Sequence, residues 1–94
     1  MNGLIDQLYD DDEITRVAAA YNLGVLGEEA AVPALIDLLG SDSVMDRRAA
    51  ALALGKIGGE DADSALEAAS DDEDDVVRRF AAEAITPSEY RRAA

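Results

Sequence analysis

The sequence contains no cysteine, no histidine and no tryptophan. Without cysteine the chain can form no disulfide and offers no thiolate nucleophile or thiolate metal ligand. Without histidine it has no imidazole base, no Ser-His-Asp triad and no ordinary zinc site. These absences remove most common catalytic and metal centres. We therefore expect no catalytic residue, no metal and no cofactor.

Basic residues are also scarce, with 8 Lys and Arg against 21 Asp and Glu and a net charge of −13. Binding to nucleic acid depends on a basic surface, so this balance argues against it. No segment approaches the roughly 18 apolar residues of a membrane span, and the first residues lack the basic and apolar regions of a signal peptide. We expect a cytoplasmic protein with no nucleic-acid or membrane partner.

The acidity itself has two interpretations. A single lysine, many aspartates and many alanines resemble the composition of proteins from salt-loving microbes, in which salt screens the self-repulsion of the surface. The same acidic surface also suits a basic or polar partner. The sequence leaves both interpretations open.

Two acidic runs, 10–13 and 71–75, raise the question of a metal site. Clustered carboxylates bind Ca²⁺ or Mg²⁺, but the alternating acids and central glycine of a calcium loop are missing from both runs. Acidic side chains are also favourable at the positive end of a helix dipole. We therefore interpret both runs as solvated helix starts.

The chain repeats itself with a period of 31 residues. Residues 11–40 align with residues 42–71, and residues 4–8 align with residues 35–39. Periods of about 20–50 residues are typical of stacked repeat architectures. The aligned columns preserve an arginine, two alanines and two glycines: Arg16, Arg47 and Arg78; Ala19, Ala50 and Ala81; Ala20, Ala51 and Ala82; Gly24 and Gly55; Gly27 and Gly58.

Each repeat has the pattern of two helices, and no strand pattern is present. Apolar and small residues recur at helical spacing over 13–26, and second helices are expected near 30–39 and 61–69. Thr86-Pro87 predicts the end of the last long helix. Helix caps are expected at residues that accept a first-turn amide, Asp12, Ser43 and Asp74, and at glycines suited to a left-handed backbone, Gly27 and Gly58.

One helix pair of this size cannot bury its apolar face alone, whereas stacked pairs can. The sequence thus predicts an all-α fold, an α-solenoid (α-α superhelix) of antiparallel helix pairs. We expect a single domain over 1–94. It consists of a half unit at 3–9, full units at 10–40 and 41–71, a half unit at 72–86 and a C-terminal tail or cap at 87–94.

The segments 12–27 and 43–58 carry an acidic turn, an arginine, a run of alanines and then Leu-Gly-x-Leu/Ile-Gly. This pattern resembles the short HEAT-like repeat of phycobilisome lyases and their relatives. The resemblance extends from Leu4 to Ile85 and departs at Thr86, which stands where the earlier units have glycine. It implies a right-handed, armadillo-like stack whose second helices line the concave side.

The same resemblance implies two sets of functional residues. Three acidic residues on the second helices, Asp6, Asp37 and Glu67, would face a partner. The repeated arginines, Arg16, Arg47 and Arg78, would form a structural ladder with turn carboxylates such as Asp42 and Asp72. Apart from the resemblance, Tyr21 is a further candidate for partner contact, because tyrosine is enriched in interfaces.

These observations favour a non-enzymatic protein–protein interaction or scaffold module with an unidentified protein partner. The alternative, from the family resemblance, is a bilin lyase-like or chromophore-chaperone role. A HEAT-repeat hydroxylase with His-Glu iron ligands is set aside, because the sequence has no histidine. We also expect a tendency to form homodimers, because the apolar residues Leu4, Ile5 and Leu8 have no preceding helix over them.

Overall fold

The computed structural model describes the backbone of residues 3–93 and the side chains of residues 3–84. The described chain is helical and contains no strand, which confirms the all-α prediction. The helices are α1 (Leu4–Gln7), α2 (Glu13–Leu26), the 3₁₀ turn η1 (Glu29–Ala31), α3 (Val32–Leu39), α4 (Val44–Ile57), α5 (Glu60–Ala69) and α6 (Asp75–Ala93).

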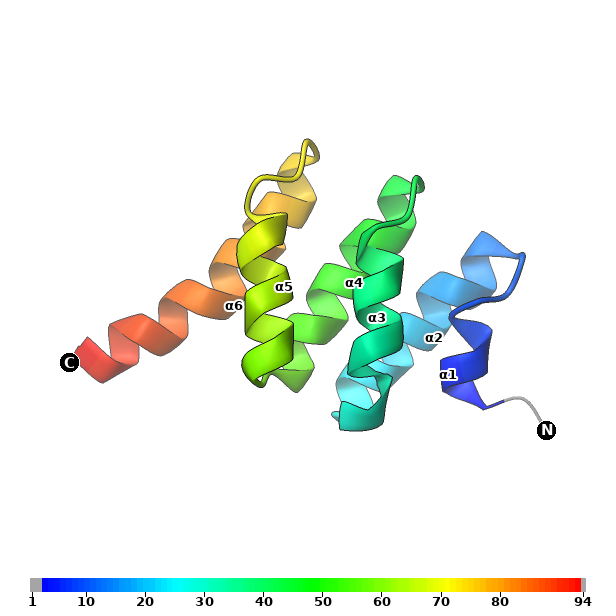
Figure 1. The fold of residues 1–94 in the computed structure, drawn as a ribbon, viewed down its shortest axis with the longest axis horizontal. Helices are drawn as coiled ribbons and strands as arrows, with labels where there is room; N and C mark the ends of the chain where they lie inside the picture. Colours follow the sequence, from blue (N-terminus) through cyan, green and yellow to red (C-terminus); the bar gives the residue numbers. More distant parts are fainter. Residues whose placement is uncertain (1–2, 94) are drawn as a thin grey trace.

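The helices form two layers (Figure 1). The short helices α1, α3 and α5 make one layer, and the longer helices α2, α4 and α6 make the other. Each short helix packs on the long helix that follows it, and the three resulting pairs stack through the contacts of α2 with α4 and of α4 with α6. The packing unit is therefore a short helix with the following long helix.

The long helices begin at side chains that accept a backbone amide of the first turn. Asp12 accepts from the amide of Thr15 at 2.9 Å, and Asp74 accepts from the amide of Val77 at 3.0 Å. Ser43 accepts from the amide of Asp46 at 3.3 Å. These bonds satisfy donors that have no partner inside the helix.

The two long helices that end at a glycine, α2 and α4, end in different ways. Gly27 adopts the left-handed conformation, and the amides of Gly27 and Glu28 bond the carbonyls of Gly24 and Leu23, which is a Schellman motif. Gly58 has a positive φ of 74° but a ψ of −168°, so the expected left-handed cap is wrong there. Gly59 also has a positive φ, and the two glycines together make a different turn into α5.

The last long helix does not end at Thr86-Pro87. α6 continues through Pro87 to Ala93, so the predicted break and separate tail from residue 87 are wrong for the backbone. A proline in a helix removes one amide donor and crowds one carbonyl, but the remaining ladder bonds can persist.

The core lies between the two layers and is made of leucines and alanines. Leu8, Leu23, Leu35, Leu54 and Leu66 have at most 2 % of their surface exposed. Alanines fill the contacts between the long helices, where small side chains let the axes approach. No described helix is long and apolar enough to cross a membrane.

Candidate functional site

Three acidic side chains lie exposed on the layer formed by α1, α3 and α5. Asp6 belongs to α1, Asp37 to α3 and Glu67 to α5, so each short helix contributes one member of this set. Figure 1 shows these helices side by side. We call this set the acidic layer.

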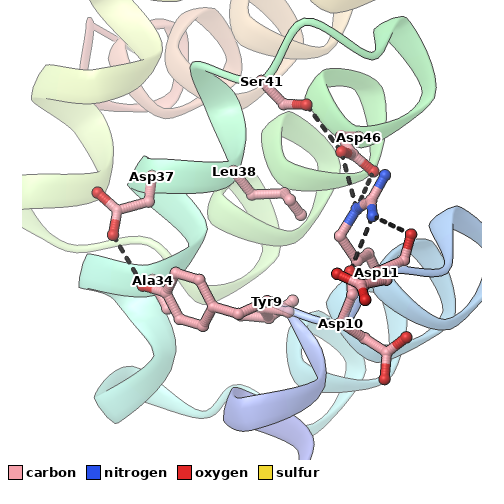
Figure 2. A pocket seen from close by; sticks show the side chains of 10 residues that line it. Tyr9, Asp10, Asp11, Ala34, Asp37, Leu38, Ser41 and Asp46 are labelled. Carbon is pink, nitrogen blue, oxygen red and sulfur yellow. Dashed lines mark hydrogen bonds and ion pairs between the residues drawn. The ribbon is translucent and has the colours of Figure 1, made fainter.

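An open groove lies between the turn that follows α1 and helix α3, beside Asp37 (Figure 2). It encloses about 370 Å³ and is lined by four carboxylates, those of Asp10, Asp11, Asp37 and Asp46. Tyr9 bridges its two walls, because its hydroxyl donates to Asp37 Oδ2 at 2.7 Å. This hydrogen bond to a carboxylate raises the pKa of the Tyr9 hydroxyl above its ordinary value.

Arg16, on the other wall of this groove, is bound to acceptors of the protein itself. Its Nε lies 3.0 Å from Asp46 Oδ2, and its Nη1 donates to the carbonyls of Asp10 and Asp11 at 2.8 and 3.0 Å. Ser41 donates a further hydrogen bond to Asp46 at 2.8 Å. The Asp46 carboxylate raises the pKa of the guanidinium. Because Arg16 is neutralised inside the protein, the groove presents a surplus of negative charge.

Arg47 repeats this arrangement one helix pair further along. Its Nε lies 3.1 Å from Asp72 Oδ2, and its Nη1 donates to the carbonyls of Ser41 and Asp42. Asp42 thus contributes its backbone carbonyl to this contact, where the resemblance implied its carboxylate. The turn points that carbonyl at the arginine while the Asp42 residue stays exposed.

Arg78 makes the corresponding turn contact in the third pair, where its Nη1 donates to the carbonyl of Asp72 at 2.8 Å. Each ladder arginine therefore holds the turn before its own helix. Arg16 and Arg47 also bind a carboxylate of the following pair. Such contacts fix the stacking of the pairs.

Three contacts were missed by the sequence analysis: Arg16 with Asp46, Arg48 with Asp74, and Tyr9 with Asp37. Arg48 Nη2 lies 2.9 Å from Asp74 Oδ1, and this pairing lowers the pKa of Asp74 to about 2. A signal for the first contact exists in the repeat. The column of Asp10 and Asp72 holds serine at 41, and the acid reappears five residues later at 46.

A second groove lies between α3 and α5, the short helices that carry Asp37 and Glu67 of the acidic layer. It encloses about 290 Å³ and is lined by small and apolar side chains, among them Ile36, Leu39 and Ala65, with Asp72 at its edge. The surface formed by the short helices thus combines exposed carboxylates with an apolar groove. That combination suits a protein segment that carries both basic and apolar side chains.

Tyr21 does not lie with the acidic layer. It belongs to α2, on the side away from the buried residues Ala19 and Leu23, and it is 53 % exposed. A single small partner on the short helices therefore does not reach it. The residues expected to contact a partner divide into the acidic layer and a separate position on α2.

The acidic runs form no metal site in the described part of the chain, where no cluster of three or more acidic side chains has ligating geometry. Asp10 Oδ1 accepts from the amide of Asp12, and Asp72 Oδ1 accepts from the amide of Asp74, both at 2.8 Å. These carboxylates are used to build the turns before α2 and α6.

The stacked helix pairs, the ladder arginines and the alanine contacts agree with a comparison against protein families, in which the model for HEAT repeats matches residues 1–86. The chain belongs to the HEAT-repeat family. The narrower resemblance to the phycobilisome lyase group within it stays a prediction.

Among solved structures, this HEAT-repeat chain is similar to human deoxyhypusine hydroxylase in complex with glycerol. The TM-score is 0.84 and the sequence identity is 35 %, and the match covers 93 % of this chain and 31 % of the hydroxylase. The chain therefore spans about a third of the length of that enzyme. A search of curated proteins found no match.

Proposed function

We propose that this HEAT-repeat protein is a non-enzymatic scaffold that binds a protein partner across its acidic layer. The observation that carries the proposal is the exposure of Asp6, Asp37 and Glu67, one on each of the three adjacent short helices. Solenoid repeats commonly present an extended surface of this kind. We further propose that the pairs follow a right-handed superhelix with the 31-residue period of the sequence.

We propose that the partner contributes a segment with basic side chains. The groove between the turn after α1 and helix α3 is lined by Asp10, Asp11 and Asp37, while its one arginine is neutralised by the fourth lining acid, Asp46. A lysine or arginine of the partner would gain from the uncompensated charge of Asp37, and apolar side chains would fill the groove between α3 and α5. The net charge of −13 would also accelerate the approach of a basic segment.

We do not propose for this chain the hydroxylase activity that the name of the human enzyme states. The 94 residues span 31 % of the hydroxylase and contain no histidine. A chromophore role likewise draws no specific support. The groove at the acidic layer would repel the carboxylates that bilins carry, because four aspartates line it.

Affinity capture from host lysate with matched variants tests the proposal. The triple variant D6N/D37N/E67Q removes three charges from the acidic layer and keeps each side chain similar in shape. The control E73Q/D75N/E83Q removes three charges from exposed positions in the turn before α6 and on α6. We expect a partner that the wild type and the control retain and the acidic-layer variant loses. Equal capture by all three proteins contradicts the proposed surface.

A further inference from the structure

The two ends of the helix stack expose surfaces whose counterparts are buried inside it. Ala20 on α2 and Ala51 on α4 are fully buried against the next long helix, but Ala82, the same position on α6, is exposed. At the other end, Asn22 on α2 is exposed, whereas the corresponding Ala53 on α4 is buried against α2. The α6 end thus presents the surface with which α2 and α4 contact the next long helix. The α2 end presents the surface with which α4 contacts the preceding long helix.

The charges on these two ends match in register. Inside the stack, Arg47 pairs with Asp72 and Arg48 pairs with Asp74. The equivalent arginines on α6 are Arg78 and Arg79, both exposed at the end of the stack. The residues equivalent to the two acceptors are Asp10 and Asp12, both exposed at the start of the stack.

The acceptor carboxylates at the start already have the geometry of the internal ones. Asp10 Oδ1 accepts from the amide of Asp12 at 2.8 Å, as Asp72 Oδ1 accepts from the amide of Asp74. Asp12 Oδ2 accepts from the amide of Thr15 at 2.9 Å, as Asp74 Oδ2 does from Val77 at 3.0 Å. No rearrangement of this turn is needed before it receives two arginines.

We propose that a second copy of this chain docks end to end, with its α1–α2 pair following the α5–α6 pair of the first copy. Arg78 and Arg79 of one copy would pair with Asp10 and Asp12 of the next. The alternation of short and long helices would continue across the junction. This surface differs from the acidic layer and does not depend on the proposed scaffold function.

The junction is weaker than the contacts inside the chain. Gly24 and Gly55 let neighbouring long helices approach closely, but residue 86 at the same position is threonine, and Asn22 replaces the small Ala53. The two copies also repel through their net charge of −13 each. We therefore expect a reversible, concentration-dependent association that strengthens as salt screens this repulsion. Because the contact is head to tail, it extends to longer oligomers.

Sedimentation velocity from micromolar to millimolar protein, over a series of salt concentrations, tests this assembly. Two variants block opposite ends. R79E reverses one charge on α6, and D10N/D12N removes the acceptor charges while an amide oxygen remains to hold each turn. D61N/D63N on α5 is the control for the change in net charge, and circular dichroism checks that each variant folds.

We expect the wild type and the control to self-associate and each end variant to remain monomeric. A mixture of R79E with D10N/D12N should recover a dimer and nothing larger, since one intact end of each kind is left. A wild type that stays monomeric throughout the series overturns the proposal. So does self-association that survives R79E, or a mixture that recovers no dimer, because both outcomes exclude head-to-tail pairing.

Discussion

Gly24 on α2 lies directly against the backbone of Ala53 on α4. A Cβ placed on Gly24 would be 2.9 Å from Ala53 Cα and 3.1 Å from Ala53 Cβ. The next crossing repeats the relationship, because a Cβ on Gly55 would lie 3.0 Å from Ala84 Cβ. The glycines in the last turn of these helices therefore set the distance at which neighbouring long helices stack.

Replacing Gly24 with alanine should destabilise the protein. The change favours the helix intrinsically by about 1 kcal/mol. Overpacking against a backbone atom costs about 1–3 kcal/mol, because the helices must move apart. We expect the loss to outweigh the gain and G24A to unfold at a lower urea concentration than the wild type.

Gly40→Ala is the matched control for this substitution. A Cβ there would meet only the Asp37 carbonyl, at an ordinary distance of 3.5 Å, and its φ is negative. We expect G40A to be neutral or slightly stabilising, by about 0.5 kcal/mol. A G24A variant as stable as G40A would show that the close approach is unimportant.

The carboxylate that pairs with a ladder arginine should work equally well at the position of Asp46 and at the position that corresponds to Asp72. Ser41 and Asp46 in one unit correspond to Asp72 and Val77 in the next, and both arrangements bind an arginine of the preceding unit. D46V alone leaves Arg16 without its carboxylate, and S41D alone crowds two acids. We expect the double variant S41D/D46V to recover more than half of the summed loss of the single variants in urea unfolding. A double variant whose loss of unfolding free energy equals the sum of the two single losses would show that the two positions are not exchangeable.

The pair of Arg48 with Asp74 should give a distinct acid dependence. The pKa of Asp74 is about 2 in the folded chain, below its ordinary value of 3.8, so the folded state binds fewer protons. Its contribution is complete above about pH 4 and is lost as the pH falls toward about 2. The difference in unfolding free energy between the wild type and R48M should shrink over that range. A difference that stays constant down to pH 2 would exclude the pair as its source.

Salt should stabilise this protein. The protein carries a net charge of −13, and ions screen its self-repulsion more than they weaken the three close ion pairs found among residues 3–84. We expect the melting temperature to rise by at least about 5 °C between about 0.1 and 2 M KCl. A melting temperature that does not rise over this range would contradict the interpretation of the acidity as salt adaptation.

The fold was accessible from the sequence because its causes are local or repeated. The column of Arg16, Arg47 and Arg78 and the helical spacing over 13–26 predict stacked helix pairs without knowledge of any long-range contact. The structure and the HEAT-repeat match confirm the all-helical repeat architecture. The prediction that Pro87 ends the last helix was wrong, because α6 gives up one ladder hydrogen bond at Pro87 and keeps the others on either side of it.

The side-chain partners were less accessible. Arg16 binds an acid 30 residues away, and Arg47 binds one 25 residues away, so one rule of spacing does not give both partners. The choice depends on whether the carboxylate lies in the first turn of the long helix, as Asp46 does in α4, or in the loop before it, as Asp72 does before α6. The bridge from Tyr9 to Asp37 likewise depends on how α1 and α3 lie beside each other, which the period alone does not specify.

The most direct test of the proposed scaffold function is amide hydrogen exchange of the chain alone and in complex with its captured partner. We expect added protection over α1, α3 and α5, with little change on α2 around Tyr21. Protection confined to α2, with α1, α3 and α5 unchanged, would contradict the acidic layer as the binding surface.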